Sequence, residues 1–401
     1  MHILIFEQRY TSLSEAGIGR FALFGREWVK SGNQVTVISG MINYISGKKP
    51  ARYRGKLFSL ESDNGIRVIR VFDSGLAYRT FIGRLFSYGT FLISAFLVGF
   101  FVNKPDVVIA SSPPIFVGPI GFFVSVLRRA TFIFEVRDLW PDEAVELGFL
   151  KNATLISMSR RLEQFLYRQA RGIVVNSPGI ARFLAEKKSV PEKKIYVVPN
   201  PTDLPAIRRK PPPPSRKEGK KFTILYTGSM SAVYDFSLII EAAAALQKEN
   251  ILFVLVGDGR GKEGAMRQAG ELWLKNIVFL PPVSKEEVLD VVASADVCIA
   301  ALKKNVGLLR YVYATKIFDY MAGAKPIVLA MEGVSCDLVS REAESGVCVS
   351  PGDLEGFIGA IYGLYLNPNG RKEMGERGLA YLKKNFEPAS LAETYLRALT
   401  K

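Results

Sequence analysis

The residues with the clearest chemical potential lie in the stretch 314–326, Ala-Thr-Lys-Ile-Phe-Asp-Tyr-Met-Ala-Gly-Ala-Lys-Pro. Thr315 suits the N-cap of a helix that Gly323 would end, so the first backbone N–H groups of that helix would be free to bind an anion. Lys316 adds a positive charge at the helix start, and Asp319, one turn further on, is placed to accept hydrogen bonds from sugar hydroxyls. The stretch predicts a nucleotide-diphosphate site; the alternative is an ordinary capped helix.

Two glycine-containing turns follow predicted strands in the same half of the chain. One turn follows the strand 222–226 and the other follows the strand 252–256, and ligands collect at the carboxyl ends of such strands. Together with Lys316 and Asp319 they predict one nucleotide-sized pocket. The turn residues assigned to it are Gly228, Ser229, Gly257, Asp258, Gly259 and Arg260.

The first half of the chain offers a different set of polar residues after the strand 131–136. Arg137, Asp138 and Trp140 follow that strand within four positions, and an indole is a flat surface on which sugars stack. A simple ion pair between Arg137 and Asp138 is the alternative. Gly17 and Gly19 open a predicted helix over 18–31, where glycine would allow a ligand close to the backbone or would only make a tight turn. A nicotinamide site there is disfavoured because the third glycine of the fingerprint is missing.

Composition limits the classes of protein. The chain has 401 residues, of which 48% are hydrophobic, enough for two sizeable cores. The three cysteines, Cys298, Cys336 and Cys348, have no paired spacing, so we expect neither a disulfide nor a zinc site, and a reducing cytoplasm fits. His2 is the only histidine, which excludes a Ser-His-Asp triad and a histidine-rich metal site.

The net charge of +15 is unevenly distributed. Residues 1–200 hold 27 Lys and Arg against 15 Asp and Glu, whereas residues 222–401 hold 19 against 21. This asymmetry predicts an anionic partner for the first half, either an acidic membrane or nucleic acid. Aromatic residues gather in apolar runs rather than among the basic residues, which favours the membrane and disfavours nucleic acid.

Two of those apolar runs, 90–102 and 115–127, are shorter than the roughly 20 residues that span a bilayer. Arg79 and Arg84 precede the first run, and Arg128 and Arg129 close the second. Such an arrangement is typical of helices lying in a headgroup layer. Helices packed between a sheet and a partner domain are equally apolar, and this alternative stays open. The chain enters its first strand without a basic leader, so no signal peptide is expected.

Short apolar strands alternate with helices in both halves, which predicts two doubly wound, Rossmann-like parallel sheets facing a cleft. We expect a first domain over 1–200 and a proline-rich basic linker over 201–221, because consecutive prolines make a stiff spacer. A second domain is expected over 222–380 and a final helix within 381–401 that crosses back to the first. The expected strands are 3–6, 34–39, 66–72, 107–111, 131–136, 172–176, 222–226, 252–256, 277–280, 297–301, 327–330 and 347–349.

Nearly the whole chain resembles the retaining glycosyltransferases of family 4, which have the two-domain GT-B fold. The specific carriers are Arg-Asp-Leu-Trp-Pro at 137–141 and Lys-Ile-Phe-Asp-Tyr-Met-Ala at 316–322, with less specific support from Gly-Ile-Gly-Arg at 17–20 and Val-Gly-Asp-Gly at 256–259. Within the family the chain is similar to bacterial transferases of O-antigen and capsule assembly, such as fucosamine transferases that extend a lipid-linked sugar.

The resemblance implies that the second domain binds a UDP-linked nucleotide-sugar, with Lys316 on the diphosphate and Asp319 on the ribose. It places the acceptor in the first domain, with Asp138 beside the acceptor hydroxyl and Gly17, Gly19, Arg137 and Trp140 as further acceptor-binding residues. Two departures stand out. The first acid of the family's Glu-x7-Glu pattern falls on Tyr311, and the usual cations after the first strand of the second domain fall near Ser229 and Tyr234, so Arg310, Arg260 or Lys262 would assist Lys316.

The expected reaction moves a hexose or N-acetylated amino sugar to a polyprenyl-diphosphate-linked saccharide, with retention at the anomeric carbon, on the inner face of the bacterial plasma membrane. Lys316 would stabilise the leaving diphosphate and Asp138 would orient the acceptor proton. No metal and no cofactor are expected, because no Asp-x-Asp motif stands at an evident strand end. The alternative enzyme is a non-hydrolysing sugar-nucleotide epimerase, which the single terminal histidine disfavours.

Overall fold

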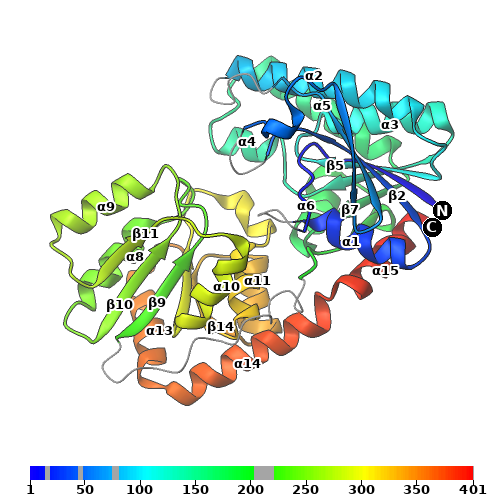
Figure 1. Ribbon diagram of the computed structural model, residues 1–401. Coiled ribbons are helices and arrows are strands. Elements are labelled where there is room, and N and C mark those ends of the chain that lie inside the picture. The colour runs from blue at the N-terminus through cyan, green and yellow to red at the C-terminus, as the bar shows by residue number, and fades with distance from the viewer. Residues whose placement is uncertain (14–18, 44–47, 75–80, 203–220, 401) are drawn as a thin grey trace. The chain divides into compact units, whose positions relative to one another are not determined.

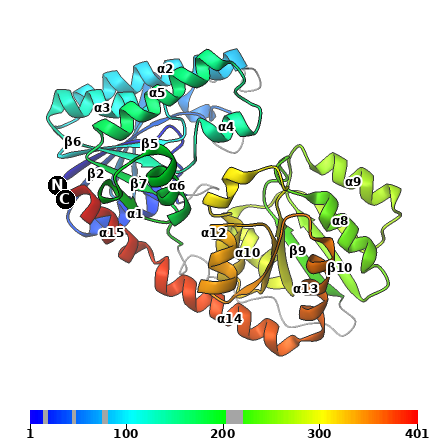
Figure 2. The same ribbon diagram turned by 180° about the vertical axis from the view of Figure 1, so that it is seen from behind.

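The computed structural model describes residues 1–13, 19–43, 48–74, 81–202 and 221–400. The chain divides into two compact units, of which the first comprises Met1–Pro201 with Pro388–Lys401 and the second comprises Thr202–Glu387. Most of the segment expected as a linker, residues 203–220, lies outside the described residues. Each unit has one sheet with helices on both faces (Figures 1 and 2).

The first unit is built on an eight-stranded sheet in the order β3-β4-β2-β1-β5-β6-β7-β8. All neighbours pair in parallel except β3 and β4, which form an antiparallel pair at one edge. The strands that form the sheet are β1 (His2–Phe6), β2 (Gln34–Gly40), β3 (Phe58–Asp63), β4 (Ile66–Val71), β5 (Val107–Ser112), β6 (Thr131–Val136), β7 (Gly172–Val175) and β8 (Ile195–Val197).

Helices cover both faces of this sheet, with α2, α3 and α5 on one face and α1, α6 and α15 on the other (Figures 1 and 2). The helices of the unit are α1 (Arg20–Lys30), η1 (Ala51–Tyr53), α2 (Phe81–Phe101), α3 (Val117–Arg128), α4 (Asp142–Glu146), α5 (Ala153–Gln169), α6 (Pro178–Lys188), η2 (Glu192–Lys194) and α15 (Pro388–Thr400). Among the described residues, none of the helices combines the length and the apolar content needed to cross a bilayer.

The last helix of the chain, α15, completes the core of the first unit. Its Tyr395 is fully buried against α1, where its ring lies edge-on to Trp28 with 5.2 Å between centroids. The indole of Trp28 donates a hydrogen bond to the Ala392 carbonyl at 3.0 Å. Beneath them, Arg20 and Glu135 form a fully buried ion pair at 2.8 Å, and the Tyr395 hydroxyl also bonds Glu135. The expected return of the final helix to the first domain is therefore confirmed.

The second unit is built on a six-stranded parallel sheet in the order β11-β10-β9-β12-β13-β14. Starting from β9, successive strands are added first on one side of the sheet and, from β12 on, on the other side. Its strands are β9 (Phe222–Thr227), β10 (Ile251–Val256), β11 (Ile277–Leu280), β12 (Val297–Ala301), β13 (Ile327–Ala330) and β14 (Gly346–Val349). Its helices are α8 (Phe236–Ala245), α9 (Lys262–Glu271), α10 (Lys285–Ser294), η3 (Gly307–Tyr311), α11 (Lys316–Ala322), α12 (Val334–Asp337), η4 (Leu338–Glu342), α13 (Leu354–Leu366) and α14 (Pro368–Asn385).

The strand order of the second sheet reverses between β9 and β12, and this point is where a ligand is expected. In doubly wound sheets, ligands bind beyond the carboxyl ends of the strands that flank it. In the second unit β9 and β12 flank this point, and the turn after β9 begins at Gly228. The predicted donor residues therefore fall where such a fold collects a ligand.

Candidate functional site

The two glycine turns of the second unit are packed directly against each other. Gly228, Gly257 and Gly259 all have positive φ angles, of 111°, 155° and 150°. A Cβ atom on Gly257 would lie 1.9 Å from the Gly228 carbonyl oxygen, and one on Gly259 would lie 2.5 Å from the Met230 carbonyl oxygen. Any side chain at these two positions would therefore separate the turns. These glycines allow the two strand-end turns to pack against each other, so that the turns form one continuous surface, called here the floor.

Lys316 reaches this floor from α11 and is buried there. Only 7% of the residue is exposed, and within the described residues its ammonium nitrogen has no hydrogen-bond partner. The Nζ atom lies 3.6 Å from the ring centroid of Tyr226 and 3.8 Å from that of Tyr234. A Cβ atom on Gly228 would lie 3.8 Å from the same nitrogen. Burial lowers the pKa of Lys316 well below its ordinary value, and no carboxylate offsets that effect.

The start of α11 differs from the expectation. The Thr315 side chain does not cap the helix, because Thr315 itself has helical backbone angles. The N–H groups of Ile317 and Phe318 donate to the carbonyls of Ala314 and Thr315, so they are not free for an anion. With seven residues, α11 is also a short helix. The expected Thr315 cap is therefore wrong, and so is the expectation that these two N–H groups are free, whereas phosphate binding by Lys316 stays a prediction.

The other predicted donor residues occupy varied positions. Ser229 is exposed and its carbonyl accepts a 2.6 Å bond from the Tyr226 hydroxyl, while the Asp258 carboxylate accepts from the Gly259 N–H at 2.8 Å. Arg260 is exposed on the same turn, but Lys262 donates to the Gly257 and Leu280 carbonyls instead of pointing at Lys316.

Three further residues predicted to bind the donor, Arg310, Tyr311 and Asp319, lie further along the chain. Arg310, on η3, lies 3.7 Å from the Glu332 carboxylate, so it faces the loop before α12. Tyr311 and Asp319 are partly buried. The structure thus brings the glycine turns and Lys316 together, with no described contact that joins Arg310 to them.

In the first unit, the polar residues after β6 form a cluster with residues that sequence reasoning missed. The Arg137 guanidinium donates to Glu7 at 3.0 Å, and Glu7 directly follows β1. Burial raises the pKa of Glu7 to about 7 against the opposing charge of Arg137. Burial also raises the pKa of Asp138, again opposed by Arg137. Glu143 on α4 has its pKa raised to about 7 by burial and by the charge of Asp138. This edge of the sheet therefore holds three carboxyl groups whose pKa values burial raises above their ordinary values.

Two of the remaining acceptor candidates, Trp140 and Gly19, lie among the described residues. The Trp140 ring packs edge-on against Phe116 with 5.7 Å between centroids. Gly19 precedes α1, and a Cβ atom there would lie 3.1 Å from the Thr11 carbonyl oxygen, which favours the tight-turn interpretation. Gly17 lies outside the described residues. Within the described ranges, no group of three or more His, Cys, Asp or Glu side chains is arranged to hold a metal ion.

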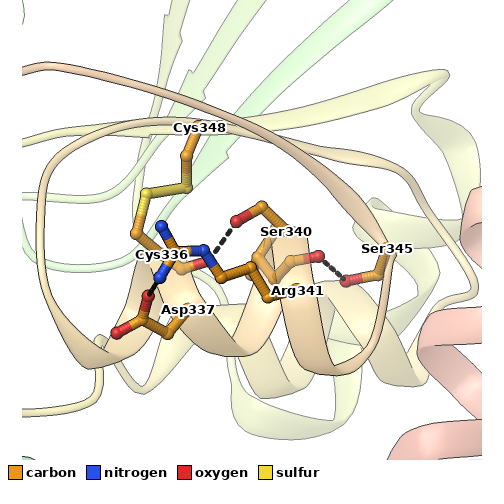
Figure 3. The surroundings of a disulfide bond; sticks show 7 residues. Cys336, Asp337, Ser340, Arg341, Ser345 and Cys348 are labelled. Carbon is orange, nitrogen blue, oxygen red and sulfur yellow. Dashed lines mark hydrogen bonds and ion pairs between the residues drawn. A yellow bond between two sulfur atoms is a disulfide. The ribbon is translucent and has the colours of Figure 1, made fainter.

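The cysteines differ from the expectation as well. Cys336 on α12 and Cys348 on β14 form a disulfide with 5.8 Å between their Cα atoms (Figure 3). Cys298 is free and buried. Nearby, Ser340 donates to the Cys336 carbonyl and Arg341 pairs with Asp337 (Figure 3). The pair could not be recognised from spacing, because the π-turn η4 and the start of β14 fold the intervening residues back.

Comparisons with known proteins agree with this architecture. Residues 17–201 match the family model described as "Glycosyl transferase 4-like domain", and residues 221–367 match "Glycosyl transferases group 1". The chain is 25% identical to a putative colanic acid biosynthesis glycosyl transferase, WcaI, of Escherichia coli strain K12, over 94% of this chain and 96% of that protein.

Solved structures also resemble the chain. Sucrose-phosphate synthase from Thermosynechococcus elongatus has a TM-score of 0.73 at 16% identity, covering 99% of this chain and 97% of that one. Alr3699/HepE from Anabaena, solved in complex with UDP-glucose, has a TM-score of 0.71 at 14% identity, covering 100% and 99% of the two chains. At these identities the likeness shows a shared fold.

Proposed function

The chain belongs to glycosyltransferase family 4 and has the GT-B fold of two Rossmann-like domains, and from this we propose the reaction it catalyses. It transfers a hexose or N-acetylated amino sugar from a UDP-sugar to a polyprenyl-diphosphate-linked saccharide, in the synthesis of bacterial surface polysaccharide. The likeness to the colanic acid transferase supports the pathway class, and the UDP-glucose complex of HepE supports the donor class. The enzyme works at the inner face of the plasma membrane.

One observation carries the proposal: among the residues that the structure describes, none places an anion beside the buried amine of Lys316. Burial without a partner disfavours the charged form of Lys316, as its lowered pKa reflects, and an arriving anion would favour that charged form. The diphosphate of a nucleotide-sugar is such an anion, and the glycine turns leave backbone close to it. As the bond to the sugar breaks, negative charge grows on the diphosphate, and a fixed cation stabilises that charge most.

In this proposal the first unit binds the acceptor. Asp138 accepts or orients the proton of the acceptor hydroxyl, because its raised pKa makes it a better base than an exposed aspartate. Arg137, held by Glu7, lies beside it and favours its ionised form. Attack from the face that the leaving group vacates would retain the anomeric configuration without a protein nucleophile. Lys316 takes the role of neutralising the diphosphate, so the proposed reaction requires no metal.

The test combines donor binding and product formation. A thermal-shift panel of UDP-, GDP- and dTDP-sugars should show stabilisation by the UDP-sugars, since ligand binding stabilises the folded state. Transfer to a lipid-linked acceptor should then fall by about 100-fold or more in Asp138→Asn, because general-base contributions are of this size. Near-normal turnover of Asp138→Asn would remove Asp138 from the chemistry. A product with inverted anomeric configuration, read by NMR, would refute retention.

A further inference from the structure

The two apolar runs of the first unit form neighbouring helices, α2 and α3, that lie side by side on one face of its sheet (Figures 1 and 2). Each helix buries one side. On α2, Phe91 and Ala95 are fully buried, and Gly99 lies close enough to β1 that a Cβ atom would be 2.7 Å from the Phe6 ring. The interpretation of these runs as buried core helices is therefore correct for one side of each helix only.

The other side of both helices is exposed and apolar. Ile93, Leu97 and Phe101 recur at helical spacing on α2, and Phe123 and Leu127 do so on α3. Ile93 is 66% exposed and Phe101 is 81% exposed. A contiguous row of large exposed apolar side chains is uncommon on a protein whose surface faces water alone, and such rows mark sites of interaction.

The charged residues within these two helices are all basic. Neither α2 nor α3 contains an aspartate or a glutamate. Arg128, at the end of α3, lies with its guanidinium 6.0 Å from the centroid of the Phe100 ring, so a cation borders the apolar row directly. This combination of an apolar row and a basic border is complementary to a bilayer with anionic headgroups.

A cavity of about 430 Å³ opens at the same end of α3. Val126 belongs to its lining and to the exposed side of α3, so the cavity and the apolar surface are continuous. Arg129 and Arg171 also line it, together with one acid, Asp106, whose carboxylate accepts a bond from the His2 N–H. The cavity lies at the amino ends of β5 and β6, whereas Asp138 follows the carboxyl end of β6.

We propose that α2 and α3 are a bilayer-docking surface, with their exposed apolar side chains at the acyl boundary and the phosphate of an anionic phospholipid in the cavity between Arg129 and Arg171. The proposal deepens the proposed function, on which its biological purpose rests, by naming the residues that hold the enzyme where a lipid-linked acceptor lies. Two arginines on one phosphate give charge-assisted hydrogen bonds as well as attraction.

The test is flotation of the full chain with vesicles that contain no donor and no acceptor, so its result is independent of glycosyl transfer. The protein should float with phosphatidylcholine vesicles that contain phosphatidylglycerol, and much less with phosphatidylcholine alone. Ile93→Ser with Phe101→Ser should weaken binding about tenfold or more. The matched control is Leu366→Ser with Trp273→Ser in the second unit, whose side chains are 64% and 84% exposed, and this variant should float like the unmodified chain.

A second pair of variants tests the cavity. Arg129→Ala with Arg171→Ala should weaken binding to the anionic vesicles about tenfold or more, since each basic residue near an anionic surface contributes separately. Arg267→Ala with Lys275→Ala, which removes two exposed cations from the second unit, should not. Circular dichroism and thermal unfolding of each variant show that it is folded.

Three outcomes would overturn the proposal. Equal flotation of the apolar variant and the unmodified chain would remove the surface from membrane binding. Release from vesicles by inorganic phosphate, but not by chloride of equal ionic strength, would make the cavity a site for free phosphate. A dimer in light scattering that the Ile93→Ser and Phe101→Ser changes convert to monomer would assign the surface to self-association. If flotation behaves as expected and no sugar is transferred, the proposed reaction fails and the docking surface stands.

Discussion

At the scale of single residues, the environment of Lys316 is unusual because aromatic rings stand where a second cation was expected. The rings of Tyr226 and Tyr234 have their centroids 3.6 and 3.8 Å from the Lys316 ammonium nitrogen, and such rings stabilise a cation without neutralising it. Tyr234→Leu should therefore weaken UDP binding by about 2- to 30-fold, the range that one cation–π contact supports. Tyr234→Phe keeps the ring and should bind UDP nearly as well as the unmodified chain. Isothermal titration calorimetry measures both.

The control for this change is Tyr362→Leu, because Tyr362 and Tyr234 are both partly buried tyrosines packed against the same core. It should leave UDP affinity unchanged, and uridine, which lacks the diphosphate, should bind equally to all variants. Equal losses in Tyr234→Leu and Tyr234→Phe would show that the hydroxyl, not the ring, is what matters. Unchanged UDP affinity in Lys316→Met would instead refute the donor role of Lys316 itself.

Glu143 makes a pH-dependent contribution to stability whose sign follows from its raised pKa. Its carboxyl has a pKa of about 7 in the folded chain and 4.5 as the ordinary value. Between these values the folded chain holds a proton that the unfolded chain has lost, so stability falls as pH rises from 4.5 to 7. The loss is at most about 3 kcal/mol, at 1.36 kcal/mol per pKa unit, and partial exposure reduces it.

Glu143→Gln should remove that slope, and urea unfolding at pH 5 and at pH 7.5 would measure it. Glu271→Gln, which changes an exposed residue at the end of α9, should keep the slope of the unmodified chain. A slope that survives in Glu143→Gln would mean that other carboxyl groups, such as Glu7, dominate the titration.

At the scale of elements, α15 stabilises the first unit from the far end of the sequence. Tyr395→Ala should destabilise that unit by about 3–5 kcal/mol, since it empties a fully buried aromatic position against Trp28. Tyr395→Phe removes only the bond to Glu135 and should cost about 1 kcal/mol. Urea unfolding followed by tryptophan fluorescence compares them. Arg397→Ala, on the exposed side of α15, should have little effect, and a loss as large as that of Tyr395→Ala would argue against the packing explanation.

Sequence periodicity predicted most of the elements because buried parallel strands are apolar throughout. Two strands of the first sheet were missed, and each lacks that signal. In β3, polar and apolar residues alternate at an exposed edge, and β8 has only three residues, none of them buried. The prediction that Thr315 caps the helix was wrong because Thr315 itself adopts helical backbone angles. Residue type alone does not determine those angles.

At the scale of the whole molecule, donor binding should be confined to the second unit. Hydrogen exchange with UDP present should protect peptides over 226–235, 257–261 and 314–320, where Lys316 and the glycine turns lie. Uridine alone should protect the last of these segments less, because it carries no anion for Lys316. Protection centred on residues 135–142 instead would move the nucleotide site to the first unit.

Local motifs were enough to predict Asp138 and the glycine turns at strand ends and Lys316 at a helix start. Glu7 and Glu143 escaped notice because their chemistry arises from neighbours that are far away in sequence or from burial: Arg137 lies 130 positions from Glu7. The tyrosines around Lys316 were missed for the same reason, since an apolar strand gives no sign of which ring will face a cation. These side chains lose their contact with water only when the sheet has assembled, so the sequence does not reveal the resulting pKa shifts.

The place of α15 has a consequence for how the chain is made. The hydrophobic surface of α1 around Trp28 leaves the ribosome more than 350 residues before α15, the helix that covers it. The whole second unit can fold in the meantime, because none of its strands belongs to the first sheet. Until α15 has been synthesised, then, the nascent first unit carries an uncovered aromatic surface to which a chaperone can bind.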